Sequence, residues 1–436
     1  MRGTAARSAQ PRTHPVPRRR EPAVPGGDTV RIAMVSASAS PLAVLGGADV
    51  GGPHVYIAEL SAALARLGHE VVVYTRRTAE GMSGDVVLGP GVRVRPLAAG
   101  PAVALSDEDL LPHLPEFAQE LRAAWARELP EVVHAYGWTS GMAAVEAARG
   151  SGTAVVQTFH GLGTAYRRFR GAADPLAAGR IALERSVAAQ ATLLIATSTA
   201  EQRELRSWGV AAARIRVVPC GVDVARFTPE GPRAPRGERP RILTLGQLRP
   251  RKGVETAIRA LPAVPDAELV VVGGPEASAV RTDPEAVRLH RLARRLGVAD
   301  RVCFLGRVPH GEVPALLRSA DVVVNVPWDE PCGMSTVEAM ACGIPVVASD
   351  AGSHRDTVVH EITGVLVPPR DPRALGVRLR SLLHDVVAAE SYGIAGADRA
   401  AARFSWETVA REVDACCAAA LDAAGRSPCL ATEALP

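Results

Sequence analysis

The sequence predicts an α/β fold built from two doubly wound parallel sheets. Short, continuously apolar runs rich in β-branched residues alternate with longer Ala-, Leu- and Arg-rich segments of helical period. Continuous hydrophobicity indicates strands buried on both faces, as in parallel sheets covered by helices. The alternation stops at the Pro-rich segment TPEGPRAPRGERP, residues 228–240, and then restarts. We therefore expect two Rossmann-like domains joined by a linker.

The predicted strands fall into two series, one on each side of the linker. The first series is 30–36, 71–75, 131–135, 154–158, 192–197 and 214–218. The second series is 241–245, 268–272, 301–305, 321–325 and 345–348. The N-terminal domain is accordingly placed at residues 29–227 and the C-terminal domain at 241–400. Ligands of open parallel sheets bind beyond the carboxyl ends of the strands, so the site is expected in the cleft between the two domains.

The remaining segments lie at the two ends of the chain. Residues 1–28 are rich in Pro, Arg and Ala without an apolar run, which predicts a disordered basic tail. Residues 401–425 are predicted to form a C-terminal helix that crosses back, and residues 426–436 a second tail. Ser405 caps this helix, whose apolar face carries Val409, Val413, Cys416 and Ala420.

The charge distribution argues against a nucleic-acid partner. The chain has 50 Lys+Arg against 46 Asp+Glu. Residues 1–30 contain six Arg against Glu21 and Asp28, so the rest of the chain carries 44 charges of each sign. Nucleic-acid-binding domains carry basic stripes on the folded surface, and a neutral body lacks them. No stretch approaches the roughly 18 apolar residues of a membrane span, which leaves room only for peripheral membrane contact.

Two residue types stand out in the composition. Lys252 is the one lysine, and the other 49 cations are arginine. Where basic positions default to Arg, a retained Lys suggests a site that needs a compact ammonium group. The seven cysteines are scattered without a CxxC pair, so neither a metal site nor a disulfide framework is predicted. We expect a reduced, cytoplasmic enzyme.

A glycine-rich loop follows the first predicted strand. Gly46 and Gly47 precede Gly51-Gly52-Pro53, and a helix with Ile57, Leu60, Leu64 and Leu67 on one face comes next. Glycines before a helix let the backbone approach a phosphate and aim free N–H groups at it. The spacing is neither GxGxxG nor GxxxxGK[ST], so a nicotinamide dehydrogenase or a P-loop NTPase lacks its usual loop.

Two further loops in the second domain carry charged residues. Residues 246–253, GQLRPRKG, follow a predicted strand and place Lys252 at the entrance of a helix. Residues 327–345, PWDEPCGMSTVEAMACGIP, place Glu330 on a loop and Glu338 one turn into a helix that starts near Ser335. Paired carboxylates facing a cleft can hold vicinal sugar hydroxyls, and the free N–H groups at 333–335 can stabilise negative charge.

Together these segments resemble the retaining, GT-B type glycosyltransferases of family 4. The resemblance covers roughly residues 30–425. It rests on the following stretches: GGPHVYIAELSAALARLGHEVVVYT, VVPCGVDVARFTP, GQLRPRKGVETAIRAL, VVGG, EPCGMSTVEAMACGIPVVASDAG, TGVLVPPRDPRAL and the closing FSWETV. The family transfers a sugar from a nucleotide sugar, and for this chain we expect a donor of UDP or GDP type and a small-molecule or glycan acceptor. It retains the anomeric configuration and needs neither metal nor cofactor.

The resemblance implies a role for several residues by position. Lys252 would hold the donor diphosphate, Glu338 the ribose hydroxyls and Glu330 the transferred sugar. Backbone groups near Val308 would contact the base, and Gly52 would let the N-terminal loop close on the phosphate. The donor site would be completed by the amides of Gly333, Met334 and Ser335 and by the charged loop with Gln247, Arg249 and Arg251.

The family's front-face mechanism uses no protein nucleophile. The leaving diphosphate helps to deprotonate the acceptor hydroxyl, so the protein stabilises negative charge, for which Lys252 is suited. His160, in the stretch TFHG, matches the family's histidine near the acceptor. One departure stands at Gln247, where the family usually has Arg. We expect Arg249 to supply the missing charge.

The N-terminal half resembles most the branch of sucrose-phosphate synthases and inositol-3-phosphate glycosyltransferases, through GGPHVYIAEL, YTRRT and SDEDLLPHLPEFAQEL. Arg180 matches a phosphate-binding Arg of the inositol enzymes, and Arg168 would serve an anionic acceptor or be solvated. Gly161 stands where those enzymes have Thr, which weakens the case for a phosphorylated polyol as acceptor.

Two alternatives remain from other classes. Gln247 leaves open a catalytically weak nucleotide-sugar-binding protein, and a nucleotide-sugar 2-epimerase shares the two-domain architecture but not the E-x7-E segment. The sequence Asp107-Glu108-Asp109 would be a metal-binding D-x-D motif in the other glycosyltransferase fold. Here it follows Ser106, which predicts a capped acidic first turn of a helix instead.

Overall fold

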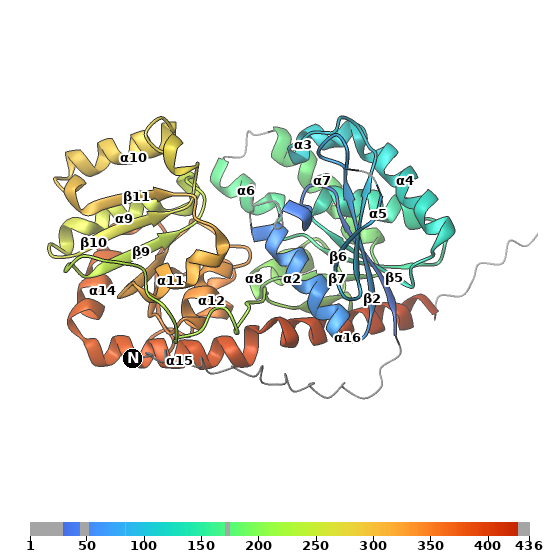
Figure 1. Cartoon of the computed structure of the whole chain (residues 1–436). Coiled ribbons are helices and arrows are strands. Elements are labelled where there is room, and N and C mark those ends of the chain that lie inside the picture. Colours follow the sequence, from blue (N-terminus) through green and yellow to red (C-terminus); the bar gives the residue numbers. More distant parts are fainter. Residues whose placement is uncertain (1–28, 44–51, 83, 171–174, 426–436) are drawn as a thin grey trace, which may run out of the picture.

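The computed structural model describes residues 29–43, 52–82, 84–170 and 175–425. The predicted tails 1–28 and 426–436 and the glycines Gly46, Gly47 and Gly51 lie outside these residues. Two twisted sheets, one in each half of the chain, are flanked by helices on both faces (Figure 1). The α/β fold with two doubly wound parallel sheets is therefore confirmed.

The first half forms an eight-stranded sheet in the order β3-β4-β2-β1-β5-β6-β7-β8, parallel except for the β3–β4 pair. Its strands are β1 (Arg31–Ser36), β2 (Glu70–Arg76), β3 (Val86–Gly89), β4 (Val92–Leu97), β5 (Val132–Tyr136), β6 (Ala154–Thr158), β7 (Leu193–Ala196) and β8 (Ile215–Val217). Its helices are α2 (Gly52–Arg66), α3 (Asp107–Leu110), α4 (Leu114–Arg127), α5 (Trp138–Ala148), α6 (Gly163–Arg170), α7 (Pro175–Gln190) and α8 (Thr199–Ser207).

The second half forms a six-stranded parallel sheet in the order β11-β10-β9-β12-β13-β14. Its strands are β9 (Arg241–Leu245), β10 (Glu268–Val272), β11 (Val302–Gly306), β12 (Val322–Asn325), β13 (Val346–Ser349) and β14 (Val365–Val367). The helices that follow β9 are α9 (Val254–Ala260), α10 (Pro284–Arg295), α11 (Val313–Arg318), α12 (Met334–Ala341), α13 (His354–Thr357), α14 (Pro372–His384), α15 (Val386–Phe404) and α16 (Trp406–Gly425).

Short 3-10 turns complete the chain: η1 (Leu111–His113), η2 (Ala212–Arg214), η3 (Pro250–Lys252), η4 (Leu261–Ala263), η5 (Ala277–Ala279), η6 (Ala299–Arg301) and η7 (His310–Glu312).

Every segment predicted as a strand is a strand, with small differences at the ends. The continuous apolar runs are buried on both faces, as in β5, where each residue is buried. Three strands were not predicted: β3, β4 and β14. In β4 the apolar run is broken by Arg93 and Arg95, which pair with Asp85 and Glu128 at the edge of the sheet. Their charges hide the strand pattern from a search for continuous hydrophobicity.

The last helix pair joins the two halves (Figure 1). Helix α15 packs against α12 and α14 of the second half, and α16 packs against α2 and β6 of the first half. The chain turns at Ser405, which bridges to Val222 and caps α16 by accepting a hydrogen bond from the Thr408 N–H. The apolar face of α16 is buried as predicted, with Trp406, Val409, Val413, Cys416 and Ala420 among its buried residues.

The acidic triplet after Ser106 is helical, as predicted. Helix α3 spans Asp107–Leu110, and the Ser106 hydroxyl accepts a hydrogen bond from the Asp109 N–H. All three carboxylates occupy the first turn, where the helix dipole favours negative charge. The triplet is a helix start.

Candidate functional site

The two charged loops of the second half meet at the carboxyl ends of neighbouring strands. Strands β9 and β12 pair directly, so the loops that follow them lie side by side. Lys252, at the end of η3, places its Nζ 2.8 Å from Oε2 of Glu330. The Gly333 N–H donates to the other carboxylate oxygen over 3.3 Å. The single lysine and the first Glu of the E-x7-E segment therefore form one ion pair.

Glycine holds both loops in place. Gly253 follows Lys252 with a φ of 78°, and a Cβ there would lie 2.0 Å from the Val326 carbonyl oxygen. Gly352 has a φ of 56°, and a Cβ there would lie 2.2 Å from the Glu330 carbonyl oxygen. L side chains rarely adopt such angles, and here they also lack the space. The Lys252–Glu330 pair thus depends on backbone contacts that only glycine permits.

The charge of Glu330 is stabilised inside the protein. Its side chain is only 7% exposed. Burial by itself would raise the pKa of the carboxyl group, but Lys252, His354 and the hydrogen bond from the Gly333 N–H lower it to about 2. Glu330 is therefore ionised at neutral pH, and the ammonium of Lys252 is held beside it.

Helix α12 begins at the same place. Gly333 is its N-cap, with a φ of 72°, and Met334 is its first residue. Ser335 accepts a hydrogen bond from Nδ2 of Asn325 over 2.9 Å, which ties the start of the helix to the end of β12. The free N–H groups of this turn lie next to Glu330, so the site combines a cation, a carboxylate and a helix N-terminus.

The second Glu of the segment has a partner that the sequence did not suggest. Glu338 is 8% exposed, and its Oε1 lies 2.9 Å from Nε2 of His310, in η7. Val308 precedes η7 and packs against the apolar cluster beside α12. His310 was missed because it lies 28 positions before Glu338 and no recurring spacing links the two residues. Only the fold brings them together.

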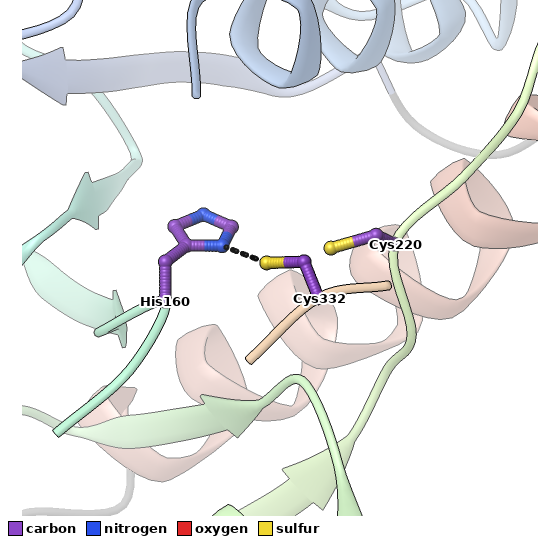
Figure 2. Close-up of side chains that lie close together, drawn as sticks. All are labelled: His160, Cys220 and Cys332. Atoms are coloured by element: carbon purple, nitrogen blue, oxygen red, sulfur yellow. Dashed lines mark hydrogen bonds between the residues drawn. The ribbon is translucent and has the colours of Figure 1, made fainter. Parts of the chain in front are cut away.

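The first half contributes His160 to the same cleft. His160 follows β6 and has a φ of 56°, unusual for a residue with a side chain. Its ring meets Tyr56 edge-on, with 4.5 Å between centroids. Nδ1 lies 3.3 Å from Sγ of Cys332, two residues after Glu330 (Figure 2). A hydrogen bond from Cys220 and the neighbouring His160 lower the pKa of Cys332 to about 6, although burial by itself would raise it.

Further contacts join the two halves around this point. A Cβ at Gly52, the first residue of α2, would lie 3.5 Å from Sδ of Met334. The Thr199 N–H and hydroxyl donate to the Asp356 carboxylate over 2.6 and 2.8 Å. The Thr197 hydroxyl donates to the Pro331 carbonyl over 2.8 Å. Gly52 and Met334, both predicted donor-site residues, therefore lie together across the cleft.

The loop with the missing arginine places two predicted residues side by side. Nε of Arg249 lies 3.3 Å from Oε1 of Gln247, and both side chains are exposed. The Arg251 carbonyl accepts a hydrogen bond from the Trp328 N–H over 2.8 Å, which links this loop to the one that carries Glu330. Arg249 thus stands next to the position where the resembled family has its own arginine.

The two arginines considered for an anionic acceptor are both paired with carboxylates. Nε of Arg180, on α7, lies 2.7 Å from Oε1 of the fully buried Glu184, and its Nη2 donates to the Gly161 carbonyl over 2.8 Å. Arg168, on α6, is paired with Glu204 of α8. The charges of these arginines are therefore largely compensated within the protein.

A pocket lies between the halves, beside the Lys252–Glu330 pair. Its walls come from both halves and include the side chains of Arg168, Glu201, Glu204, Asp329 and Glu330. Burial raises the pKa of Asp329, while Arg168 lowers it and the nearby glutamates raise it further. Arg168 pairs with Glu204 and Lys252 pairs with Glu330, so Glu201 and Asp329 make this pocket acidic.

Comparison with known proteins decides the family. Residues 51–221 match the family described as glycosyl transferase 4-like domain, and residues 230–399 match glycosyl transferases group 1. A D-inositol 3-phosphate glycosyltransferase of Xylanimonas cellulosilytica is 36% identical over 89% of this chain and 96% of that protein. This chain belongs to the family 4 glycosyltransferases. It is an enzyme of that class, with the GT-B fold.

Solved structures agree with the GT-B assignment of this glycosyltransferase. A sucrose-phosphate synthase from Thermosynechococcus elongatus superposes with a TM-score of 0.79 at 30% identity, covering 88% of this chain and 98% of that one. The Anabaena protein HepE, in complex with UDP-glucose, superposes with a TM-score of 0.69 at 20% identity, covering 89% of this chain and 100% of that one. Among the described helices of the glycosyltransferase, none is both long and apolar enough to cross a membrane.

Proposed function

We propose that this glycosyltransferase moves a sugar from a nucleotide-sugar donor to an acceptor hydroxyl, with retention at the anomeric carbon and without a metal ion. The observation that carries the proposal is the Lys252–Glu330 pair at the N-terminus of α12. This arrangement offers a point charge and free N–H groups to a diphosphate, and a carboxylate to sugar hydroxyls.

In this proposal each residue of the site takes one part of the donor. Lys252 binds the diphosphate, Glu330 the transferred sugar and Glu338 the ribose, with His310 orienting the Glu338 carboxylate. The Gly333 turn adds backbone N–H groups, and the close approach of Gly52 to Met334 shuts the cleft over the phosphate. The HepE structure contains UDP-glucose, which makes a UDP-sugar the first donor to test.

The proposed reaction needs no nucleophile from the protein. The bond from the anomeric carbon to the diphosphate oxygen breaks, and the acceptor oxygen attacks the same face of the sugar. The acceptor proton passes to the departing diphosphate. Negative charge develops on that diphosphate, so the contribution of Lys252 is greatest as the bond breaks. His160 borders the acceptor side of the cleft, where closure keeps water away from the reacting carbon.

For the acceptor, the charges of the pocket favour a neutral polyol over a phosphorylated one. The named relative acts on D-inositol 3-phosphate. In this chain Arg180 and Arg168 are both paired with glutamates, and the pocket adds Glu201 and Asp329. A phosphate there would meet like charge at close range, which is unfavourable in a partly buried site.

The test combines donors and acceptors. The protein is incubated with UDP-, GDP- and ADP-sugars, with inositol, inositol 3-phosphate and other hydroxyl acceptors, and with a chelator. We expect nucleotide release coupled to a product whose anomeric configuration, measured by NMR, equals that of the donor. Donor binding without turnover would favour the binding-protein alternative, and an isomerised donor without released nucleotide would favour an epimerase.

A further inference from the structure

Two cysteines and a histidine from three separate segments meet at the interface of the two halves (Figure 2). His160 follows β6, Cys220 follows β8, and Cys332 lies in the loop before α12. Their side-chain ligand atoms, the imidazole nitrogen and the two sulfurs, all lie within 4.8 Å of one another. Nδ1 of His160 and Sγ of Cys332 are 3.3 Å apart.

The surroundings hold these groups in place. Cys220 is 1% exposed and packs into the apolar cluster of the first half, against which Cys332 also lies. The His160 ring is fixed by its backbone angle and by edge-on contact with Tyr56. Its Nε2 is buried and has no hydrogen-bond partner among the residues described. The ligand atoms therefore converge on one point without rearrangement of the backbone.

We propose that His160, Cys220 and Cys332 form a binding site for one Zn²⁺ ion, which takes no part in the proposed steps of sugar transfer. Zinc takes thiolate and imidazole ligands in a tetrahedral arrangement, at about 2.3 Å from sulfur and about 2.0–2.1 Å from nitrogen. Ligand atoms around such an ion are roughly 3.3–3.8 Å apart. The observed atoms lie within 4.8 Å of one another, so binding needs a contraction of about 1 Å at most. The fourth position is taken by water.

Formation of this site is balanced in charge and protons. The two thiols of Cys220 and Cys332 lose one proton each to solvent as their sulfurs bind the ion, and the neutral imidazole binds through Nδ1. No electron is transferred. Soft sulfur ligands favour Zn²⁺ over Mg²⁺ or Ca²⁺, which take oxygen ligands.

The position of the site implies that a bound ion inhibits the enzyme. Cys332 belongs to the loop of Glu330, whereas His160 and Cys220 belong to the first half. A bound Zn²⁺ would bridge the two halves and occupy the imidazole of His160, which borders the acceptor side of the cleft. Zinc therefore stabilises the closed protein and inhibits it. Binding itself does not depend on the proposed sugar transfer and is measured without any sugar.

The test uses the full chain, reduced and stripped of metal. Zn²⁺ is titrated against a chromophoric chelator, and Co²⁺ is used as a spectroscopic substitute. We expect one ion per chain, a near-ultraviolet absorption from cobalt–thiolate bonds and a higher Tm. Cys220→Ser and Cys332→Ser should each weaken binding by about 100-fold or more, since even outer-shell changes cost about 10–100-fold. Cys303→Ser, at an exposed cysteine on β11, is the matched control.

Several outcomes would overturn the proposal. Equal affinity in Cys220→Ser, Cys332→Ser and the wild type would place the ion elsewhere, and bound Co²⁺ without the thiolate absorption would exclude the two sulfurs. A chain that binds no zinc but, after mild oxidation, yields peptides joined by a Cys220–Cys332 disulfide would also overturn the proposal. If one serine variant fails to fold, Cys220→Ala or Cys332→Ala is used, with circular dichroism to check folding.

Discussion

At the scale of single residues, the ion pair of Lys252 and Glu330 concentrates the chemistry of this glycosyltransferase. Both residues were found in the sequence, because each stands on a loop directly after a strand. Their contact over 2.8 Å is what the fold adds. His310 and Cys220 escaped sequence reasoning, since their partners lie far away in the chain and no spacing links them.

Replacing the lysine should therefore remove activity but not the fold. A charge-assisted hydrogen bond contributes roughly 1.5–3 kcal/mol. Lys252→Ala removes such a bond together with the positive charge of the ammonium group, so we expect it to lower kcat/KM by about 100-fold or more. Lys252→Arg should be strongly impaired as well. Arg259→Ala, at a surface ion pair with Glu255 on α9, serves as control. Near-normal transfer by Lys252→Ala would mean that the lone lysine is only a compositional accident.

Arg249 offers a second test at this scale. It lies beside Gln247, where the family usually has arginine, and we expect it to supply the missing charge to the donor phosphate. Arg249→Ala should lower donor affinity and kcat/KM by about 10-fold. Steady-state kinetics and donor titration measure the effect, again with Arg259→Ala beside it. Unchanged turnover and affinity would show that Gln247 is tolerated without compensation.

At the scale of elements, the sequence predicted each buried strand but missed those whose pattern is interrupted. Strand β4, next to the edge strand β3, carries Arg93 and Arg95 on one face, and their pairing with Asp85 and Glu128 compensates these charges. A search along the chain cannot supply such partners. The glycines in the turns around the site could be seen in the sequence. Their positive φ angles and close backbone contacts are seen only in the structure.

Gly253 gives the sharpest prediction for an element. An alanine there would be strained by the φ of 78° and would clash with the Val326 carbonyl at 2.0 Å. We expect Gly253→Ala to cost about 2 kcal/mol or more in stability and to displace Lys252. Gly311→Ala, whose Cβ would meet nothing within 4 Å, is the control. Thermal unfolding and kcat/KM are compared, and equal values for the two variants would contradict the prediction.

The buried His134, on strand β5, predicts that the stability of the protein depends on pH. Burial, with an additional contribution from the charge of His160, lowers the pKa of His134 from 6.5 to about 3. Between these values the unfolded chain binds a proton that the folded chain excludes. The free energy of unfolding should therefore decrease as the pH falls from 6.5 towards 3, by at most about 1.4 kcal/mol per pH unit.

Urea unfolding at several pH values checks this prediction. The loss should be smaller in His134→Gln than in the wild type, because the substituted residue does not titrate. His384→Gln, at an exposed histidine at the end of α14, should follow the wild type. Parallel curves for wild type and His134→Gln would show that His134 does not carry the effect.

At the scale of the whole molecule, contacts across the cleft set how firmly the two halves close. Asp356 accepts two hydrogen bonds from Thr199, each of about 1 kcal/mol. Asp356→Ala should increase the ratio of open to closed conformations by about 30-fold and raise KM for the donor. Small-angle X-ray scattering would show a larger radius of gyration. Asp350→Ala, which removes a pairing within the second half only, should scatter like the wild type. An unchanged radius for Asp356→Ala would contradict this.

The course of the chain at its end has a consequence for how the protein is made. Helix α16 supplies Trp406, Val409, Val413 and Cys416 to the apolar cluster formed by strands and helices from the start of the chain. A ribosome must therefore translate the chain as far as residues 406–420 before the first half can bury that surface. Until then the nascent N-terminal sheet leaves it uncovered, exposed to chaperones. The domain that begins first is completed last.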